Sequence, residues 1–494
     1  MPLRAGPAIG PTIARMKVDR RDFLGAVGLA ALRPQLDRGE WVDDVHSQLN
    51  RTRVAEIVTP RASDEVGAAI ERAARAGRSV SICGGRHAMG AQQFGTDTTL
   101  VDIRSLDGVG RIDADRGIVE VGAGIQWPAL IARLNEAQSR WAIAQKQTGA
   151  DQMTIGGALG ANIHGRGLTM KPFVGDVESF TLVDAQGRTR TCSRRQEPEI
   201  FALAIGGYGL FGVITSVTLR LVPRRKLERV VELAATDELA DRVEKRIAAG
   251  FLYGDLQFAI DPASDDFLRK GVFSCYRPVA DDTPVTESTK ELSGEDWGRL
   301  LRLAHHDRTR AFQEYSAYYL ATNGQVYWSD THQLSYYLDG YHAALDGGGA
   351  TRGTEMITEV YVPRPRLEAF FVEMRKAFRS NGAPIVYGTI RFIEKDDETF
   401  LPWARERYAC MVVNLHVPHT EDGLARSGDA FRTLIDLALG QGGSYYLTYH
   451  RHARREQVLA AYPQLPDFLA AKRRLDPDER FQSDWYRHYK KMLA

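Results

Sequence analysis

The sequence predicts an α+β fold made of two parts, because two patterns of secondary structure follow each other along the chain. Between residues 54 and 222, short strand-like and helix-like stretches alternate. Beyond residue 225, strand-like runs are mixed with longer helical ones, which indicates an antiparallel sheet backed by helices. Pro223 and the basic cluster Arg224-Arg225-Lys226 mark the boundary. With 494 residues, the chain is long enough for two or three domains with buried cores.

The composition removes several classes of function from consideration. Lysine and arginine number 64 against 63 acidic residues, so no charge excess indicates nucleic acid or an acidic partner. The four cysteines, Cys83, Cys192, Cys275 and Cys410, lie far apart and form no C-x-x-C pair, which predicts neither a zinc site nor a disulfide framework. No apolar run approaches the roughly 18 residues that a membrane span needs.

The N-terminus carries the pattern of an export signal. Arg20 and Arg21 precede a short apolar run at residues 23–32, which is typical of a twin-arginine leader for proteins that cross a membrane already folded. We therefore expect residues 1–45 to be leader and linker, and the mature protein to be periplasmic. The alternative is an amphipathic leader with a chance arginine pair and a cytoplasmic protein, because Arg33-Pro34 stands where a cleavage site needs small residues.

The first glycine loop is the feature around which the rest is arranged. A helix-like run at residues 63–77 leads to strand-like Val80-Ser81-Ile82 and then to Gly84-Gly85-Arg86-His87. Paired glycines allow positive φ angles and bring bare backbone N–H groups close to an anion, to which Arg86 adds positive charge. An ordinary glycine turn is the alternative for this stretch alone.

The residues that follow extend this pattern. Residues 117–124 indicate a strand, and residues 127–137 a helix with Pro128 in its first turn. Residues 154–167 form a second segment of small residues, where the backbone can lie against a large ligand. Strands at residues 180–184 and 212–222 then flank a helix at residues 199–204.

One motif in this region is misleading. Residues 207–212 match G-x-G-x-x-G letter for letter, but they open onto the β-branched residues 213–219, which favour a strand. A dinucleotide fingerprint has to open a helix. We therefore expect no nicotinamide site here.

Taken together, the motifs of residues 47–224 resemble the FAD-binding domain of the vanillyl-alcohol-oxidase family, also called the p-cresol-methylhydroxylase (PCMH) type. They are most similar to those of sugar-alcohol and aldonolactone oxidases. The resemblance implies a two-subdomain FAD-binding domain over residues 46–224, a cap or substrate domain over residues 225–455, and a C-terminal segment over residues 456–494 that returns to the FAD domain. It also implies contacts to FAD from Cys83, Gly84, Gly85, Arg86, His87, Ala88, Met89, Thr148, Thr154, Gly156, Gly157, Asn162, His164 and Ile214.

In this family the histidine of the first glycine loop often bonds covalently to the flavin 8α-methyl group. The resemblance therefore implies that FAD is attached through His87, and a neutral imidazole is a competent nucleophile near pH 7. The alternative is that His87 only lines the site. Some members add a cysteine tether, whose place falls here at residues 152–154, so we expect no second bond.

Two stretches of the cap resemble substrate-binding segments of the same oxidases. Residues 387–397 match an E-x-R-F segment in which Arg391 is kept and Thr389 replaces the glutamate. Residues 444–452 match an H-W-G-K-x-H segment in which His450 is kept and Thr448 replaces the lysine. The resemblance implies catalytic-site roles for Arg391, Tyr449 and His450. The alternatives are that the tyrosines are core residues and that Arg391 pairs with Glu359 or Asp396.

These features predict an FAD-dependent oxidoreductase that oxidises a hydroxylated small molecule of alcohol, sugar or lactone type. Hydride passes to flavin N5, while His450 or a tyrosine takes the hydroxyl proton. Electrons then pass to oxygen or another acceptor. In the family a residue near Thr148 or Gly149 controls access of oxygen, and the choice between oxidase and dehydrogenase stays open. Because the glutamate and the lysine are both replaced, a flavin-binding protein without turnover, or with a partner-binding cap, is the alternative.

We predict no metal site. The adjacent pair His305-His306 has no spaced acidic partner, and neighbouring residues on a strand point to opposite faces of the sheet. We expect no metal at the histidines of residues 450–452 either. Residues 282–352, which are polar and irregular, carry no assigned element.

Overall fold

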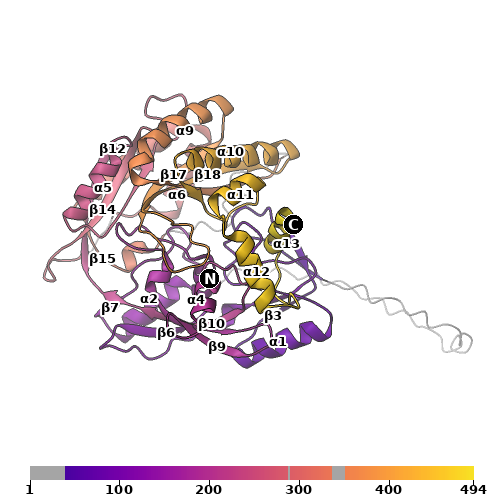
Figure 1. Cartoon of the computed structure of the whole chain (residues 1–494). Helices are drawn as coiled ribbons and strands as arrows, with labels where there is room; N and C mark the ends of the chain where they lie inside the picture. Colours follow the sequence, from indigo (N-terminus) through magenta and orange to yellow (C-terminus); the bar gives the residue numbers. More distant parts are fainter. Residues whose placement is uncertain (1–38, 287–289, 336–350) are drawn as a thin grey trace, which may run out of the picture. The chain divides into compact units, whose positions relative to one another are not determined.

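A three-stranded parallel sheet carries the first glycine loop, and Figure 1 labels one of its strands, β3, near helix α1. Its strands β3 (Glu56–Val58), β5 (Thr99–Asp102) and β4 (Val80–Cys83) lie in that order, and α1 (Ser63–Arg75) connects β3 to β4. The buried side chains of α1, among them Val66, Ile70 and Ala73, recur at helical spacing on one face. The predicted helix and strand before the loop are therefore confirmed.

The computed structural model describes residues 39–286, 290–335 and 351–494. The twin-arginine motif lies outside the described residues. Strand β1 (Glu40–Val42) pairs with β2 (Thr52–Val54), so the folded body includes residues that the sequence assigned to leader and linker.

A four-stranded antiparallel sheet follows, in the order β6 (Ile118–Gly122), β10 (Val213–Arg220), β8 (Val177–Val183) and β9 (Thr189–Ser193). Strand β10 begins directly after Gly212, as its β-branched residues predict. The other elements of this part are the helices α2 (Trp127–Ala137), α3 (Ile155–Ala161) and α4 (Pro198–Ala204), the 3₁₀ turns η1 (Ile103–Ser105) and η2 (Phe173–Asp176), and the short strand pair β7 (Trp141–Ala142) and β11 (Val222–Pro223).

The second part is built on an eight-stranded sheet in which all pairs are antiparallel, which confirms the predicted α+β class. Each inner strand buries apolar side chains. In sheet order the strands are β15 (Val326–Trp328), β12 (Lys226–Ala235), β14 (Lys270–Pro278), β13 (Tyr253–Phe258), β17 (Ile385–Ile393), β18 (Tyr408–Pro418), β16 (Gly353–Pro363) and β19 (Ser444–Tyr445).

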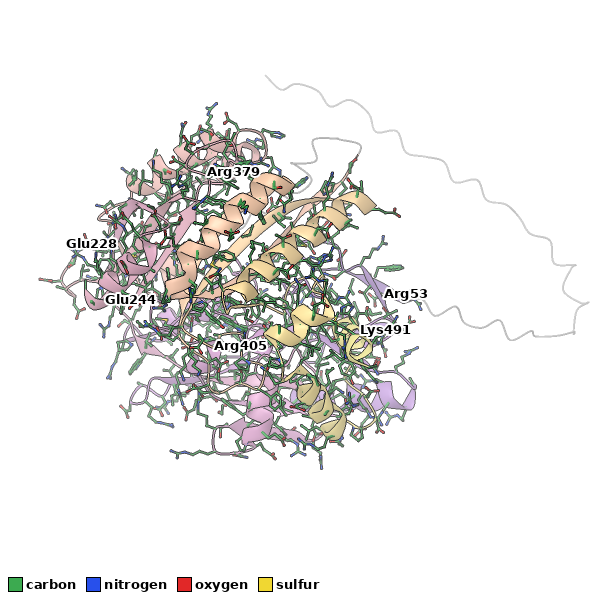
Figure 2. All side chains as sticks on the ribbon, turned by 45° about the horizontal axis from the view of Figure 1, so that its top comes forward. Arg53, Glu228, Glu244, Arg379, Arg405 and Lys491 are labelled. Atoms are coloured by element: carbon green, nitrogen blue, oxygen red, sulfur yellow. The ribbon has the colours of Figure 1, made fainter. Side chains whose placement is uncertain are left out.

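Two long helices pack against this sheet side by side (Figure 2). They are α9 (Leu367–Asn381), which carries Arg379, and α10 (Glu421–Gly440). Helix α9 buries Phe370, Phe371, Met374 and Phe378 on one stripe and ends at Gly382, whose φ of 63° is the left-handed conformation that stops a helix.

The remaining helices are α5 (Leu239–Ala248), α6 (Gly294–His306), α7 (Arg308–Leu320), α11 (Arg455–Ala461), α12 (Leu465–Leu475) and α13 (Asp484–Leu493), with the 3₁₀ turns η3 (Thr331–Gln333) and η4 (Arg364–Arg366). Helices α6 and α7 lie in the stretch where the sequence assigned no element. Among the described residues, no helix combines the length and the apolar character that a membrane crossing requires.

The C-terminal segment completes the sheet of the first part. Phe481 forms a parallel bridge with Val80, and the backbone N–H of Gln482 donates to the Val80 carbonyl. Asp476 holds this segment in place, because its carboxylate accepts bonds from the backbone N–H groups of Arg480 and Phe481 and from the buried ammonium of Lys472. The last residues of the chain therefore support the strand that leads into the first glycine loop.

Candidate active site

The two predicted glycine segments meet at one cavity, which contains about 1220 Å³ of space between protein atoms, part of it open to solvent. Most of the predicted FAD contacts line it, together with one of the predicted catalytic residues. They are Cys83, Gly84, Gly85, Arg86, His87, Ala88, Met89, Thr148, Gly156, Gly157, Ile214 and Tyr449.

The first glycine loop needs glycine for a different reason from the one expected. Neither Gly84 nor Gly85 has a positive φ, and the left-handed residue is Arg86, with a φ of 59°. A Cβ atom on Gly84 would lie 2.0 Å from Thr154 Oγ1, and one on Gly85 would lie 2.3 Å from the Gln152 carbonyl. The glycines therefore allow the two segments to touch, rather than allowing the turn.

The charges around this loop are partly balanced within the protein. Arg86 donates to Asp102 over 3.4 Å, while Asp102 makes its shortest bond, 2.6 Å, to Arg104. The Nε atom of Arg86 is buried without a hydrogen bond. Burial, and next the charge of Asp102, raises the pKa of the Cys83 thiol to about 12, so this cysteine is a neutral thiol at pH 7.

His87 is a buried, neutral imidazole. Its Nδ1 lies 2.8 Å from His46 Nε2, and burial followed by the neighbouring His46 lowers the pKa of His87 to about 3. Its Nε2 is buried with no partner in good hydrogen-bonding geometry, although the Gln152 backbone is close enough to oppose the fall in pKa. Sequence reasoning missed His46, because it stands at the very start of the predicted FAD-binding domain, outside the glycine segments that carried the resemblance.

Three predicted FAD contacts do not line the cavity and instead shape its wall. The Thr154 hydroxyl accepts from the Gly157 N–H and caps α3. Asn162, in the left-handed conformation at the other end of α3, donates to Asp396 and accepts from the Val174 N–H. His164 bonds to Glu359 on the cap sheet.

The misleading glycine motif also reaches the cavity. Tyr208, Gly209, Phe211 and Gly212 line it, and Gly209 has a φ of 75°. Our sequence reasoning correctly excluded a helix after this motif, but it left these residues without a role at the site.

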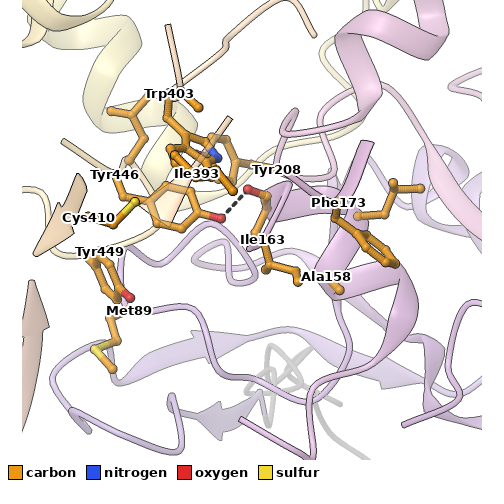
Figure 3. Packing of buried hydrophobic residues seen from close by; sticks show 14 of the residues in the cluster. Met89, Ala158, Ile163, Phe173, Tyr208, Ile393, Trp403, Cys410, Tyr446 and Tyr449 are labelled. Carbon is orange, nitrogen blue, oxygen red and sulfur yellow. Dashed lines mark hydrogen bonds between the residues drawn. The ribbon is translucent and has the colours of Figure 1, made fainter. Parts of the chain in front are cut away.

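The cap contributes one wall of the cavity through Ile357, Tyr446, Thr448 and Tyr449. The Tyr446 hydroxyl donates to the Ala161 carbonyl over 2.5 Å, and Figure 3 shows Tyr446 and Tyr449 among the packed side chains of this region. Gln92 donates to the Thr448 hydroxyl, and the Met89 and Gly90 N–H groups donate to the Thr448 carbonyl. Thr448 thus joins the cap to the first glycine loop.

His450 does not line the cavity. Burial, and next the nearby His452, lowers the pKa of His450 to about 3, and its Nε2 is buried without a hydrogen bond. A proton acceptor at the cavity wall is therefore better sought at Tyr449.

Arg391 is buried behind the cavity wall and is 4% exposed. Its Nε and Nη1 atoms have no hydrogen-bond partner, and no described residue forms a salt bridge with it. Asp396 bonds to Asn162 and Thr399 instead, and Glu359 bonds to His164 and Tyr449, so the suggested pairing of Arg391 with either acid is absent.

His164, Glu359 and Cys410 place one potential metal-ligand atom each within 4.8 Å of one another. Sequence reasoning did not bring these three residues together, because they come from different elements. His164 and Glu359 are already directly bonded to each other at 2.5 Å, which accounts for their closeness without an ion.

The cavity fits FAD on three grounds. The lining residue Gly160 leaves open space where a Cβ would stand, the lining residue His87 has a buried Nε2 without a hydrogen bond among the described residues, and the lining is largely apolar with a few polar groups. A family model described as an FAD binding domain matches residues 54–193.

Curated relatives agree along most of the chain. L-gulono-1,4-lactone dehydrogenase of Mycobacterium tuberculosis is 26% identical over 87% of this chain and 95% of its own length. L-gulonolactone oxidase of Bos taurus is 22% identical over 85% of this chain and 92% of its own. D-arabinono-1,4-lactone oxidase of Eremothecium gossypii is 28% identical over 49% of this chain and 44% of its own.

The chain is an FAD-dependent oxidoreductase with a PCMH-type FAD-binding domain. In this flavoprotein the two glycine segments and the G-x-G-x-x-G stretch are positioned to hold FAD, while the cap sheet supplies the remaining wall.

A Gly160→Val substitution should remove FAD while leaving the folded protein stable. Gly160 lines the cavity, and a Cβ there would meet no protein atom within 4 Å, so the side chain would occupy ligand space. Gly156→Val is the matched control: its Cβ would lie 2.9 Å from both Ala123 and Ile103, so it should lower the melting temperature as well. Flavin content and melting temperature of both variants check this, and a Gly160→Val protein with full flavin occupancy would contradict it.

Proposed function

We propose that this enzyme oxidises a carbon that bears a hydroxyl group, on a small polar substrate of the lactone or sugar-alcohol type. The observation that carries the proposal is Arg391, a buried guanidinium with two unpartnered nitrogens in the cap sheet. A buried guanidinium whose nitrogens lack hydrogen bonds is costly, and a polar ligand would supply the missing hydrogen bonds. The names of the lactone-oxidising relatives point to the same substrate class.

Bound FAD supplies the hydride acceptor for this chemistry. The chain's own residues bind and orient the substrate and move its proton. Arg391 anchors an oxygen of the substrate, and the Tyr449 hydroxyl, which belongs to the cavity wall, meets the reacting hydroxyl. Tyr446, fixed to the Ala161 carbonyl, holds the neighbouring wall in place.

The test is anaerobic bleaching of the yellow protein. L-gulono-1,4-lactone, D-arabinono-1,4-lactone and xylitol are added in turn, and flavin absorption is followed. We expect at least one to bleach the flavin, and admission of air or of an electron-accepting dye then separates an oxidase from a dehydrogenase. Failure of every lactone and polyol in a wider panel would favour the alternative, a flavin-binding protein without turnover.

We also propose that FAD is attached covalently through His87. The low pKa of His87 keeps its imidazole neutral, and the contact with His46 fixes the ring orientation. The neutral Nε2 of His87, which makes no hydrogen bond of good geometry to the described residues, is a suitable nucleophile for the flavin methyl group.

Finally, we propose export to the periplasm through Arg20-Arg21. Replacing both arginines by lysine should retain the flavin-loaded protein in the cytoplasm of a bacterial host, while the unchanged chain is recovered from the periplasm. Fractionation followed by flavin fluorescence measures this, and equal distribution of the two proteins would count against the signal.

A further inference from the structure

Glu359 joins two side chains that come from opposite sides of the cavity wall. Its carboxylate, which is completely buried on β16, lies 2.5 Å from His164 Nε2 through one oxygen and accepts the Tyr449 hydroxyl at 3.1 Å through the other. Tyr449 lines the cavity, whereas His164 is wholly buried behind it. The three groups therefore form a continuous hydrogen-bonded chain from the cavity into the interior.

The strand register explains why Glu359 is in this position. Glu359 on β16 and Thr389 on β17 both pair with Val412 on the intervening β18. Directly paired residues of antiparallel strands project to the same face, so Glu359 and Thr389 share one row across the sheet. Ile357, two residues along β16, lines the cavity, so this face of the strand looks toward it.

The shared row explains why the sequence appears to lack the glutamate of the E-x-R-F pattern. Thr389 occupies the glutamate position of the E-x-R pattern, and its hydroxyl donates to the Leu256 carbonyl instead. Glu359 lies two strands away from Thr389 in the same row, so the two residues are roughly 10 Å apart across the sheet. The guanidinium of Arg391 lies near enough to act on the charge of Glu359.

The pKa shifts of Glu359 and Tyr449 indicate which of these hydrogen-bonded groups holds a proton and which can accept one. Burial acts to raise the pKa of Glu359, but the charge and hydrogen bond of His164, then Arg391 and Tyr449, leave that pKa below its ordinary value. Burial, and next the charge of Glu359, raises the pKa of Tyr449 well above its ordinary value. Tyr449 therefore holds its proton at pH 7, while Glu359 is an ionised acceptor.

We propose that Tyr449 and Glu359 form the relay that takes the hydroxyl proton of the substrate, with His164 as the positioning residue for the carboxylate. The substrate O–H bond breaks and its electron pair becomes the second C–O bond, as the C–H bond gives its electron pair and hydrogen to FAD, the oxidant. The proton moves to the Tyr449 oxygen, and the Tyr449 proton moves to Glu359. This inference rests on the proposed function.

Glu359→Gln tests the carboxylate, because the amide keeps the size of the side chain but cannot take the proton. We expect the anaerobic rate of flavin bleaching to fall about 10²- to 10⁴-fold. Glu355→Gln is the matched control. Glu355 is also buried on β16 and also faces a histidine, His305, at 3.3 Å, but among the described residues no cavity-lining side chain bonds to it, whereas Glu359 accepts from Tyr449. Its bleaching rate should stay at the wild-type value.

Tyr449→Phe is the second variant, because Glu359→Gln also disturbs the buried pair with His164. The phenylalanine removes only the relay oxygen, and the bleaching rate should fall by a similar factor with flavin content unchanged. Tyr361→Phe is its control: Tyr361 is buried two residues from Glu359, and its hydroxyl has no hydrogen bond. A Glu359→Gln or Tyr449→Phe protein that folds, holds FAD and bleaches at the wild-type rate would falsify the relay.

A measurement without turnover separates this inference from the proposed function. In the flavin-loaded protein labelled with ¹³C at tyrosine Cζ, the signal absent from Tyr449→Phe reports on the Tyr449 hydroxyl. It should shift in Glu359→Gln but not in Glu355→Gln, and it should shift in the wild type when L-gulono-1,4-lactone or xylitol binds. Shifts without bleaching would refute the proposed oxidation and retain the relay contact. Bleaching without any shift on binding would refute the relay alone. If the protein shows neither bleaching nor a shift, both the relay and the proposed oxidation are overturned.

Discussion

An Arg391→Met variant should melt at or above the wild-type temperature while its kcat/KM falls by about one to two orders of magnitude. The guanidinium is buried at 4% exposure, and two of its nitrogens have no partner, so it costs the substrate-free protein stability. Methionine fills similar space without a charge. A substrate oxygen would lose a charge-assisted hydrogen bond worth roughly 1.5–3 kcal/mol.

Arg364→Met is the control for this prediction. Arg364 is equally buried, but it bonds to Glu244 at 3.0 Å, to Glu394 at 3.1 Å and to two backbone carbonyls. Its loss should lower the melting temperature, because breaking a buried pair costs about 3–5 kcal/mol. Melting temperature, flavin content and kcat/KM are measured on the same preparations. If Arg391→Met melts well below the wild type and keeps its turnover per flavin, Arg391 is a structural residue.

A His87→Ala variant should lose all acid-stable flavin. After acid precipitation the wild-type pellet should stay yellow and its mass should include one FAD, whereas the His87→Ala pellet should be colourless. The large effect is expected because one bond holds the cofactor through denaturation.

Cys83→Ser is the control, because it tests whether the Cys83 thiol on the cavity wall, rather than His87, attaches FAD. This thiol has a pKa of about 12, so it is not a thiolate at pH 7 and the variant should keep a yellow pellet. Release of flavin from the wild-type protein on precipitation would show that FAD is held without a covalent bond.

Much of the fold could be predicted from local signals. Helix α2 begins and ends at the predicted residues, because Pro128 suits a first turn and the apolar positions Trp127, Leu130, Ile131 and Leu134 recur on one face. Strand β10 was separated from a dinucleotide-binding helix by its β-branched residues. Helix α7 was missed because its apolar residues form only a weak periodic pattern. Helix α6 was missed although Trp297, Leu300 and Ala304 recur at helical spacing, a signal that could have found it.

The site was predictable only where neighbours in sequence are neighbours in space. The loop from Cys83 to Met89 was found as a unit. The contact of His46 with His87 and that of Glu359 with Tyr449 join residues separated by 41 and 90 positions, and no local pattern reports such pairs. Glu359 was named only as a possible partner of Arg391. The register of three strands, rather than any motif, decides that it shares a row with Thr389.

The bridge between Val80 and Phe481 has a consequence for biosynthesis. The strand that feeds the first glycine loop gains its outer neighbour only after almost the whole chain has left the ribosome. A nascent chain that ends before Asp476 lacks the clamp that holds this neighbour, so we expect FAD to be captured only after this segment has been synthesised. The proposed twin-arginine export, which carries folded proteins, would then have to follow cofactor capture.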